Sequence, residues 1–69
     1  MKPINLRLTD DTGHVFTWSV WRDARTPADW RLTTHDDCER HAGNTWASAV
    51  PYIYAIAENY GLALTRSIS

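Results

Sequence analysis

The sequence predicts a small α+β fold, in which an antiparallel sheet packs against one main helix. Three observations carry this prediction. Apolar and polar residues alternate over residues 4–9 and 14–22, as they do in half-buried strands. Between Trp46 and Tyr60, apolar residues recur at intervals of three and four, as on the buried side of a helix. Alternation returns over residues 62–68, which predicts a terminal strand beside the first two.

The first two strands are expected to form a hairpin. Residues 10–13 read Asp-Asp-Thr-Gly, in which aspartates can accept bonds from nearby amides and Gly13 can adopt a positive φ. One face of the second strand is expected to meet the core and consists of Phe16, Trp18 and Val20. The other face carries Trp21 among small hydroxyl residues, so we expect an uncovered aromatic ring there.

The segment after the hairpin is predicted to be a loop followed by a short third strand. Pro27 disfavours a central strand, so residues 23–29 are assigned to the loop. Alternation over residues 30–33 favours a strand. The alternative is a single helical turn that opens at Thr26 and Pro27.

A short helix of about two turns is predicted before the main helix. Thr34 precedes Asp36 and Asp37, which places a hydroxyl at an N-cap and carboxylates in the first turn. Gly43 stands where such a helix would end. The predicted order is therefore ββ(β)αβ, with the short helix ahead of the main one.

The main helix is predicted to end at Gly61, and its start depends on Pro51. An interior proline loses a backbone hydrogen bond and clashes with the preceding turn. A regular helix that starts at Ser48 places Pro51 in the first turn, where the missing amide has no intrahelical acceptor. The alternative is one longer, kinked helix that begins near Trp46.

Length and composition indicate a single soluble domain over residues 1–69. Apolar residues make up 43% and charged residues 22%, and seven Lys and Arg against eight Asp and Glu give a charge of −1. This balance disfavours a surface that neutralises nucleic-acid phosphates throughout. The sole cysteine, Cys38, cannot form an internal disulfide, and neither a secretion signal nor an apolar run of about 20 residues is present. We therefore expect a cytoplasmic protein that does not contact membranes.

Aromatic content is the strongest indication of function. The chain has four Trp, three Tyr and one Phe, whereas a domain of this size buries only about 60% of its unfolded surface. Some rings are therefore expected to face a partner. Tyr, Trp and Arg are enriched where binding energy concentrates, which favours protein binding. The acidic residues of the predicted short helix are further candidates, because carboxylates can imitate phosphate spacing toward an Arg- or Lys-rich partner. The predicted protein-binding residues are Trp21, Arg22, Arg25, Trp30, Arg31, Tyr52, Tyr54, Asp36, Asp37 and Glu39.

Two alternative binding functions are weighed against this one. Trp21 and Trp30, with the arginines near them, can form a platform for single-stranded nucleic acid. His35, Cys38 and His41 stand three residues apart and can contribute to a metal site, although no Cys-x-x-Cys pair supports it. Neither reading is preferred, and we expect no cofactor.

No catalytic signature is present, so a non-enzymatic domain that acts by stoichiometric binding is predicted. A protein partner is expected, with a nucleic-acid-processing complex as one candidate. By analogy of size alone, the chain is similar to bacterial or phage accessory proteins, including inhibitors of CRISPR effectors. A homodimer through the uncovered sheet face is a further expectation.

Overall fold

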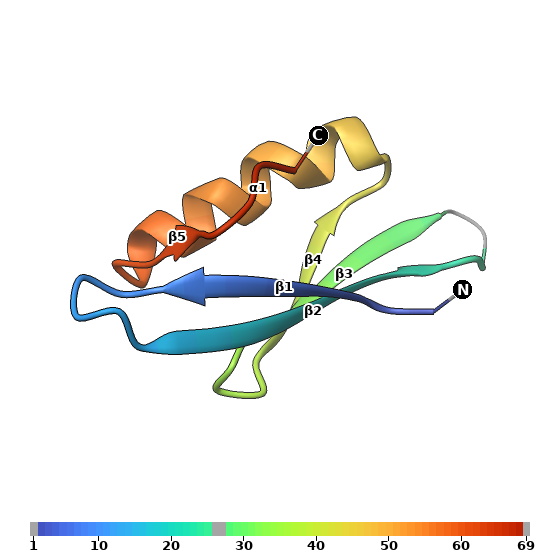
Figure 1. Cartoon of the computed structure of the whole chain (residues 1–69). Coiled ribbons are helices and arrows are strands. Elements are labelled where there is room, and N and C mark those ends of the chain that lie inside the picture. The colour runs from blue at the N-terminus through green and yellow to red at the C-terminus, as the bar shows by residue number, and fades with distance from the viewer. Residues whose placement is uncertain (1, 26–27, 69) are drawn as a thin grey trace.

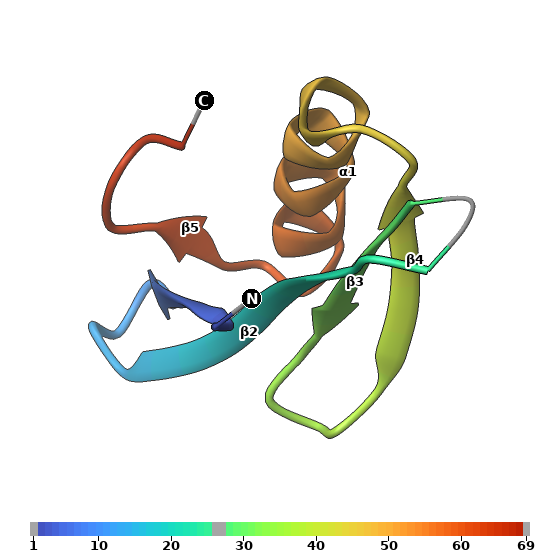
Figure 2. The same cartoon turned by 90° about the vertical axis from the view of Figure 1, so that its right-hand side faces the viewer.

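The computed structural model describes residues 2–25 and 28–68. In chain order, the elements are β1 (Ile4–Thr9), β2 (Val15–Asp23), β3 (Asp29–Thr33), β4 (Glu39–Gly43), α1 (Trp46–Asn59) and β5 (Ala63–Leu64). The strands form one antiparallel sheet in the order β4-β3-β2-β1-β5. The sheet curls, and α1 lies across one of its faces (Figures 1 and 2). The predicted α+β class is confirmed.

The predicted hairpin is confirmed in its strands and its turn. β1 pairs with β2 so that Leu6 lies opposite Trp18. Asp10 Oδ1 accepts hydrogen bonds from the amides of Thr12 and His14, both at 2.9 Å, and Gly13 has φ of 85°. An aspartate that accepts two amides while glycine reverses the chain is the turn chemistry that the sequence predicts.

The short helix predicted to start at Thr34 is wrong. Residues 34–38 form a turn instead, in which the Asp37 amide donates to the Thr34 carbonyl at 2.9 Å and Asp37 has φ of 61°. The segment that follows is β4, whose register places His41 opposite Arg31. Threonine and aspartate side chains that cap helices also stabilise turns, so the local signal fits both structures. Pairing with β3 decides between them.

β3 forms where the sequence favours a third strand. The alternative helical turn would open at Thr26 and Pro27, which lie outside the described residues, whereas Trp30 lies within β3. Alternation along β3 places Trp30 and Leu32 in the core and leaves Arg31 half-buried on the other side. The expectation that Trp30 is a surface ring is therefore wrong.

The main helix begins at Trp46 rather than at Ser48. Thr45 is its N-cap, because Thr45 Oγ1 accepts from the Ser48 amide at 3.2 Å and Ser48 Oγ accepts from the Thr45 amide at 3.3 Å. This capping box satisfies two amides that would otherwise lack partners. Pro51 consequently lies inside the helix. Ala47, whose carbonyl the proline cannot bond, lies four residues before it and is exposed.

The C-terminal strand is shorter than predicted. β5 contains two residues, which pair with Leu8 and Thr9 of β1. The Thr65 amide extends the contact by donating to the Arg7 carbonyl at 3.0 Å. Beyond that point the chain turns toward α1, where the Ile68 amide donates to Tyr54 Oη at 3.0 Å.

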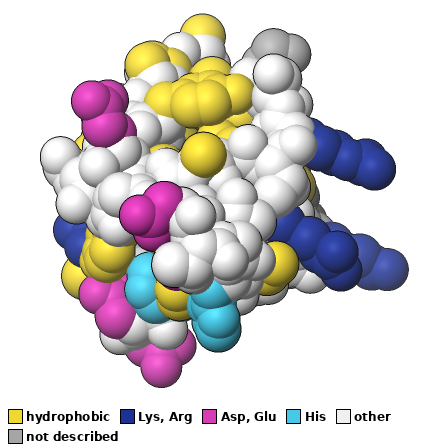
Figure 3. All heavy atoms as spheres, turned by 60° about the vertical axis from the view of Figure 1, so that its left-hand side comes forward, with side chains coloured by type: hydrophobic (Ala, Val, Ile, Leu, Met, Phe, Trp, Pro, Cys, Tyr) yellow, Lys and Arg dark blue, Asp and Glu magenta, His cyan; other side chains and the backbone are white. Residues whose placement is uncertain are grey.

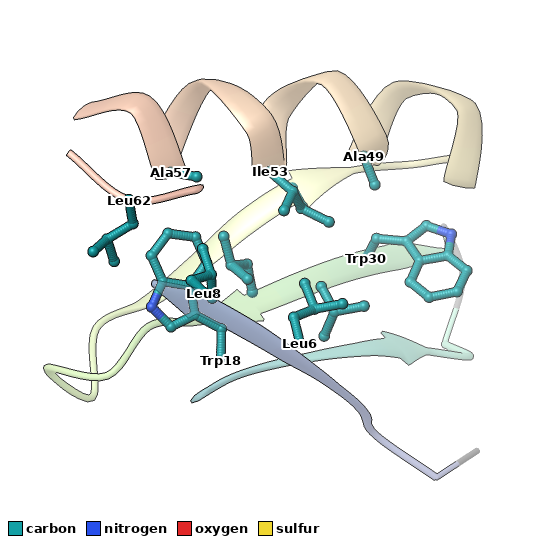
Figure 4. Close-up of a cluster of buried hydrophobic side chains, with 11 residues drawn as sticks. Leu6, Leu8, Trp18, Trp30, Ala49, Ile53, Ala57 and Leu62 are labelled. Carbon is teal, nitrogen blue, oxygen red and sulfur yellow. The ribbon is translucent and has the colours of Figure 1, made fainter. Parts of the chain in front are cut away.

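The core lies between α1 and the sheet face that it covers (Figure 4). Trp18 and Trp30 occupy opposite ends of this core, with Leu6 and Leu8 between them. The rings that pack at its margins are Phe16, Trp46, Tyr52 and Tyr60. All eight aromatic rings belong to described residues, and only Trp21 and Tyr54 lie outside this cluster. The interior therefore holds more rings than expected, since six of the eight pack in or against the core.

Candidate protein-binding surface

The face of the sheet opposite α1 is covered by none of the described elements. Along β2, Trp18 and Val20 are buried beneath the helix, whereas Trp21 points to the other side. The strand registers place the following residues on this side, which we call the open sheet face: Asn5, Arg7, Thr9, Val15, Thr17, Ser19, Trp21, Asp23, Asp29, Arg31, Thr33, Glu39 and His41.

Trp21 is the large aromatic side chain of the open sheet face. It is half-buried and lies opposite Arg31 in the β2–β3 register. Small hydroxyl side chains separate it from Val15, which is 53% exposed at the other end of β2. A flat ring beside short hydroxyl residues leaves room for a partner's side chains to approach.

The arginine beside Trp21 is already paired. Arg31 donates to Glu39 Oε1 at 3.1 Å and to Asp29 Oδ2 at 3.2 Å. His41 Nδ1 donates to the other oxygen of Asp29. Hydrogen bonds from His41 and then Arg31 lower the pKa of Asp29. The side chains around Trp21 therefore form a fixed set of paired charges.

The other arginine candidates do not form one patch with Trp21. Arg25 pairs with Asp23, with its Nη2 2.9 Å from Oδ2. Arg22 is exposed, but it follows Trp21 on β2 and so points to the opposite face of the sheet. Trp30 packs against the Trp46 ring at a centroid distance of 4.9 Å. Trp21 and Arg31 are thus the two of these candidates that the structure brings together.

The two tyrosine candidates lie on α1, on the other side of the sheet. Tyr52 packs against the core and is half-buried. Tyr54 is 40% exposed, and its hydroxyl accepts from the Ile68 amide. A partner that contacts Trp21 therefore approaches from the side opposite Tyr54.

The acidic candidates are separated by the turn that replaces the predicted helix. Asp36 accepts from Thr34 Oγ1 and, at 2.7 Å, from Tyr60 Oη, and these bonds lower its pKa to about 2. Asp37 holds the left-handed position of the turn, and Glu39 pairs with Arg31. They form no common carboxylate row.

The Asp36 cluster joins the β3–β4 turn to the end of α1. Arg40 donates to Tyr60 Oη at 2.8 Å, so the hydroxyl accepts from the arginine while it donates to Asp36. Sequence reasoning missed Thr34, Arg40 and Tyr60 as a cluster, because Tyr60 lies 20 or more positions from its partners. The sequence carries no local signal for such a contact.

The residues of the metal alternative are placed apart. His35 Nδ1 accepts from the indole Nε1 of Trp18 at 3.0 Å, on the covered side of the sheet. His41 lies on the open sheet face beside Asp29. Within residues 2–25 and 28–68, no group of three or more His, Cys, Asp or Glu residues could hold a metal ion. The proposed combination with Cys38 therefore has no support.

Side chains of different charge gather on different parts of the surface. In Figure 3, most of the visible Lys and Arg surface projects at the right, whereas the Asp and Glu side chains lie at the centre and left, where a further basic side chain is visible.

Across the described part of the chain, no helix has both the length and the apolarity needed to span a bilayer.

Comparison with known proteins gives no relative. No family model, curated protein or solved structure matches this chain.

Proposed function

We propose that this chain is a small protein-interaction domain that binds its partner stoichiometrically and carries out no chemistry itself. The observation that carries the proposal is the half-buried Trp21 on a sheet face that none of the described elements covers. Tryptophan is the residue type that most often dominates binding energy when a partner completes its burial. The neighbouring charges support specificity, because a partner must match their arrangement.

Direct binding of single-stranded nucleic acid is less well supported. Stacking platforms need exposed rings and free positive charge. Trp30 is only 9% exposed, and Arg25 and Arg31 already contact carboxylates. One half-buried ring beside neutralised arginines is a poor platform for successive bases.

Narrower forms of the proposal rest on size and composition. One such form is an accessory or inhibitory protein of a bacterium or phage. It would act in the cytoplasm on a nucleic-acid-processing complex, and a short chain is typical of such proteins. A second copy of the chain is the simplest alternative occupant of the open sheet face, because paired identical faces would cover both Trp21 rings.

The test is affinity capture with the wild type, Trp21→Ala and Glu58→Ala, followed by quantitative mass spectrometry. Trp21→Ala should weaken binding of a stoichiometric protein partner by about tenfold or more. Glu58→Ala is the control, because it truncates an exposed side chain of α1 on the opposite side of the molecule. It should change capture by less than about twofold.

Three results would contradict this function. Equal capture by the wild type and Trp21→Ala would show that Trp21 is not at the interface. Recovery of nucleic acid alone would favour the alternative, and so would a steep loss of binding as salt rises. A large fall in the melting temperature of Trp21→Ala would assign the ring to folding instead.

A further inference from the structure

A groove of about 700 Å³ lies between β1 and the C-terminal segment. Its apolar lining comes from Ile4, Leu6, Leu64 and Ile68. It exists because the chain pairs with β1 only as far as Thr65 and then turns toward Tyr54 on α1. The first half of β1 is therefore left without a neighbouring strand on that side.

The backbone beside this groove is an open strand edge. The Arg7 carbonyl points toward β5, since it accepts from the Thr65 amide. Backbone groups two residues apart on a strand point the same way, so the Asn5 amide and carbonyl also point toward the groove. The order β4-β3-β2-β1-β5 places no strand beside Asn5 on that side among the described residues. An extended segment could continue the line of β5 along this edge.

The charge of the groove is one-sided. Its ionisable lining residues are Arg7 and Arg66, and none of the described acidic residues lines it. Neither arginine forms an ion pair within residues 2–25 and 28–68. This differs from Arg25 and Arg31, which are both paired. The groove therefore offers two free guanidinium groups, which suit carboxylates.

We propose that the groove binds an extended, acidic segment of a protein partner, which adds to the free edge of β1 as a further strand. Successive side chains of a strand point to opposite faces. Ile4 and Leu6 lie on the helix side of β1, whereas Arg7 lies on the open sheet face. The segment that fits best alternates apolar residues, which meet Ile4 and Leu6, with Asp or Glu residues, which meet Arg7 and Arg66. This proposal rests on the protein-binding function above and adds the chemistry of one partner segment.

The probe is a fluorescein-labelled ten-residue peptide of alternating glutamate and valine, with both ends blocked. Anisotropy titration should show saturable binding with Kd below about 1 mM. A peptide of alternating lysine and valine should not bind. A peptide with the same glutamates and valines in two blocks should bind at least about fivefold more weakly, because its carboxylates cannot all face the arginines. In ¹⁵N spectra, the amide signal of Asn5 should shift on titration.

Charge and backbone contributions are tested with separate variants. Arg7→Glu and Arg66→Glu should each weaken peptide binding by about fivefold or more. Arg22→Glu is the matched control, because it makes the same charge change at an exposed arginine that does not line the groove. Asn5→Pro should abolish binding while thermal unfolding remains cooperative, since the amide that it removes points away from β2.

A contrary outcome either overturns the proposal or identifies a different occupant of the groove. Failure of the Glu-Val peptide to bind, or equal weakening by Arg22→Glu, would overturn the proposal. Tighter, Arg7-dependent binding of an oligothymidine would show that the groove takes phosphates instead. Concentration-dependent dimers that Asn5→Pro dissolves and Arg7→Glu does not would assign the edge to a second copy. Trp21→Ala should leave peptide binding unchanged, so the groove and the open sheet face can fail separately.

Discussion

The two faces of the sheet use the same strands for different purposes. On β2, Trp18 and Val20 are fully buried under α1, while Val15 on the opposite face is 53% exposed. The covered face owes its stability to apolar burial, which is worth about 25 cal/mol per Å² removed from water. The open sheet face instead has hydroxyl groups, ion pairs and one half-buried tryptophan. We infer that folding depends mainly on the first face, which leaves the second free to vary with its partner.

The largest expected difference in the free energy of unfolding comes from one substitution on each face of the same strand. Val20→Ala should lower the free energy of unfolding by about 2 to 3 kcal/mol, because it removes fully buried methyl groups and leaves a cavity. Val15→Ala should change it by about 0.5 kcal/mol or less. Urea unfolding followed by circular dichroism measures both. Similar losses for the two variants would show that the open sheet face is also buried, as in a dimer.

The contrast between the faces was partly predictable. Period-2 alternation correctly predicts that Trp18 and Val20 face inward, and helical periodicity correctly predicts α1 as the element that covers them. Trp30 was misplaced although a signal existed: it shares its strand face with Leu32, and an apolar pair on one face indicates the core side.

Other features could not be predicted, because they depend on contacts between distant residues. The 34–38 turn and a helix N-terminus use the same threonine and aspartate chemistry, and only pairing of β4 with β3 selects the turn. The groove beside β1 depends on Ile68 reaching Tyr54, which has no local pattern. Of the predicted binding residues, Trp21 and Arg31 share a surface because their strands pair, whereas the order of the residues along the chain separates them by ten positions.

A second comparison uses one histidine from each side of the sheet. His35 accepts the hydrogen bond of the buried Trp18 indole, and its ring meets Phe16 at a tilt and Tyr60 edge-on. His35→Ala should lower the free energy of unfolding by about 1 to 2 kcal/mol, because the indole N–H loses its protein acceptor. His41 contacts Asp29 on the open sheet face, and its side chain is 54% exposed. His41→Ala should cost about 0.5 kcal/mol or less.

Thermal unfolding at neutral pH measures the two histidine variants under the same conditions. His35→Gln offers a further control, since its side-chain oxygen can accept from the indole if it reaches the same position. Partial recovery of stability in His35→Gln would assign the effect to the hydrogen bond. Equal destabilisation by His35→Ala and His41→Ala would contradict the distinction between the two faces.

The smallest expected effect is the contribution of single carboxylates to stability in acid. The carboxylates compared are Asp36, beside α1, and Asp29, on the open sheet face. Bonds from Thr34 and Tyr60 hold the pKa of Asp36 at about 2, below its ordinary value of 3.8. A lowered folded-state pKa stabilises the native state above the unfolded value, and this contribution is lost as pH falls through the folded value. Asp36→Asn should therefore melt at a lower temperature than the wild type at pH 7. The difference should shrink between about pH 4 and pH 2.

Melting curves at a series of acidic pH values measure this difference directly. Comparison with the wild type at each pH cancels the titration of Asp10, Asp23 and Asp29, whose pKa values are also lowered. Asp29→Asn is the counterpart on the open sheet face, where the ion pair with Arg31 is only partly buried, so salt can screen it. The effect of Asp29→Asn should therefore fall in 1 M NaCl more than that of Asp36→Asn, because Asp36 accepts from neutral hydroxyl groups rather than from a cation. Equal salt sensitivity would mean that both carboxylates act through charge alone, and the hydroxyl cluster beside α1 would then lose its assigned role.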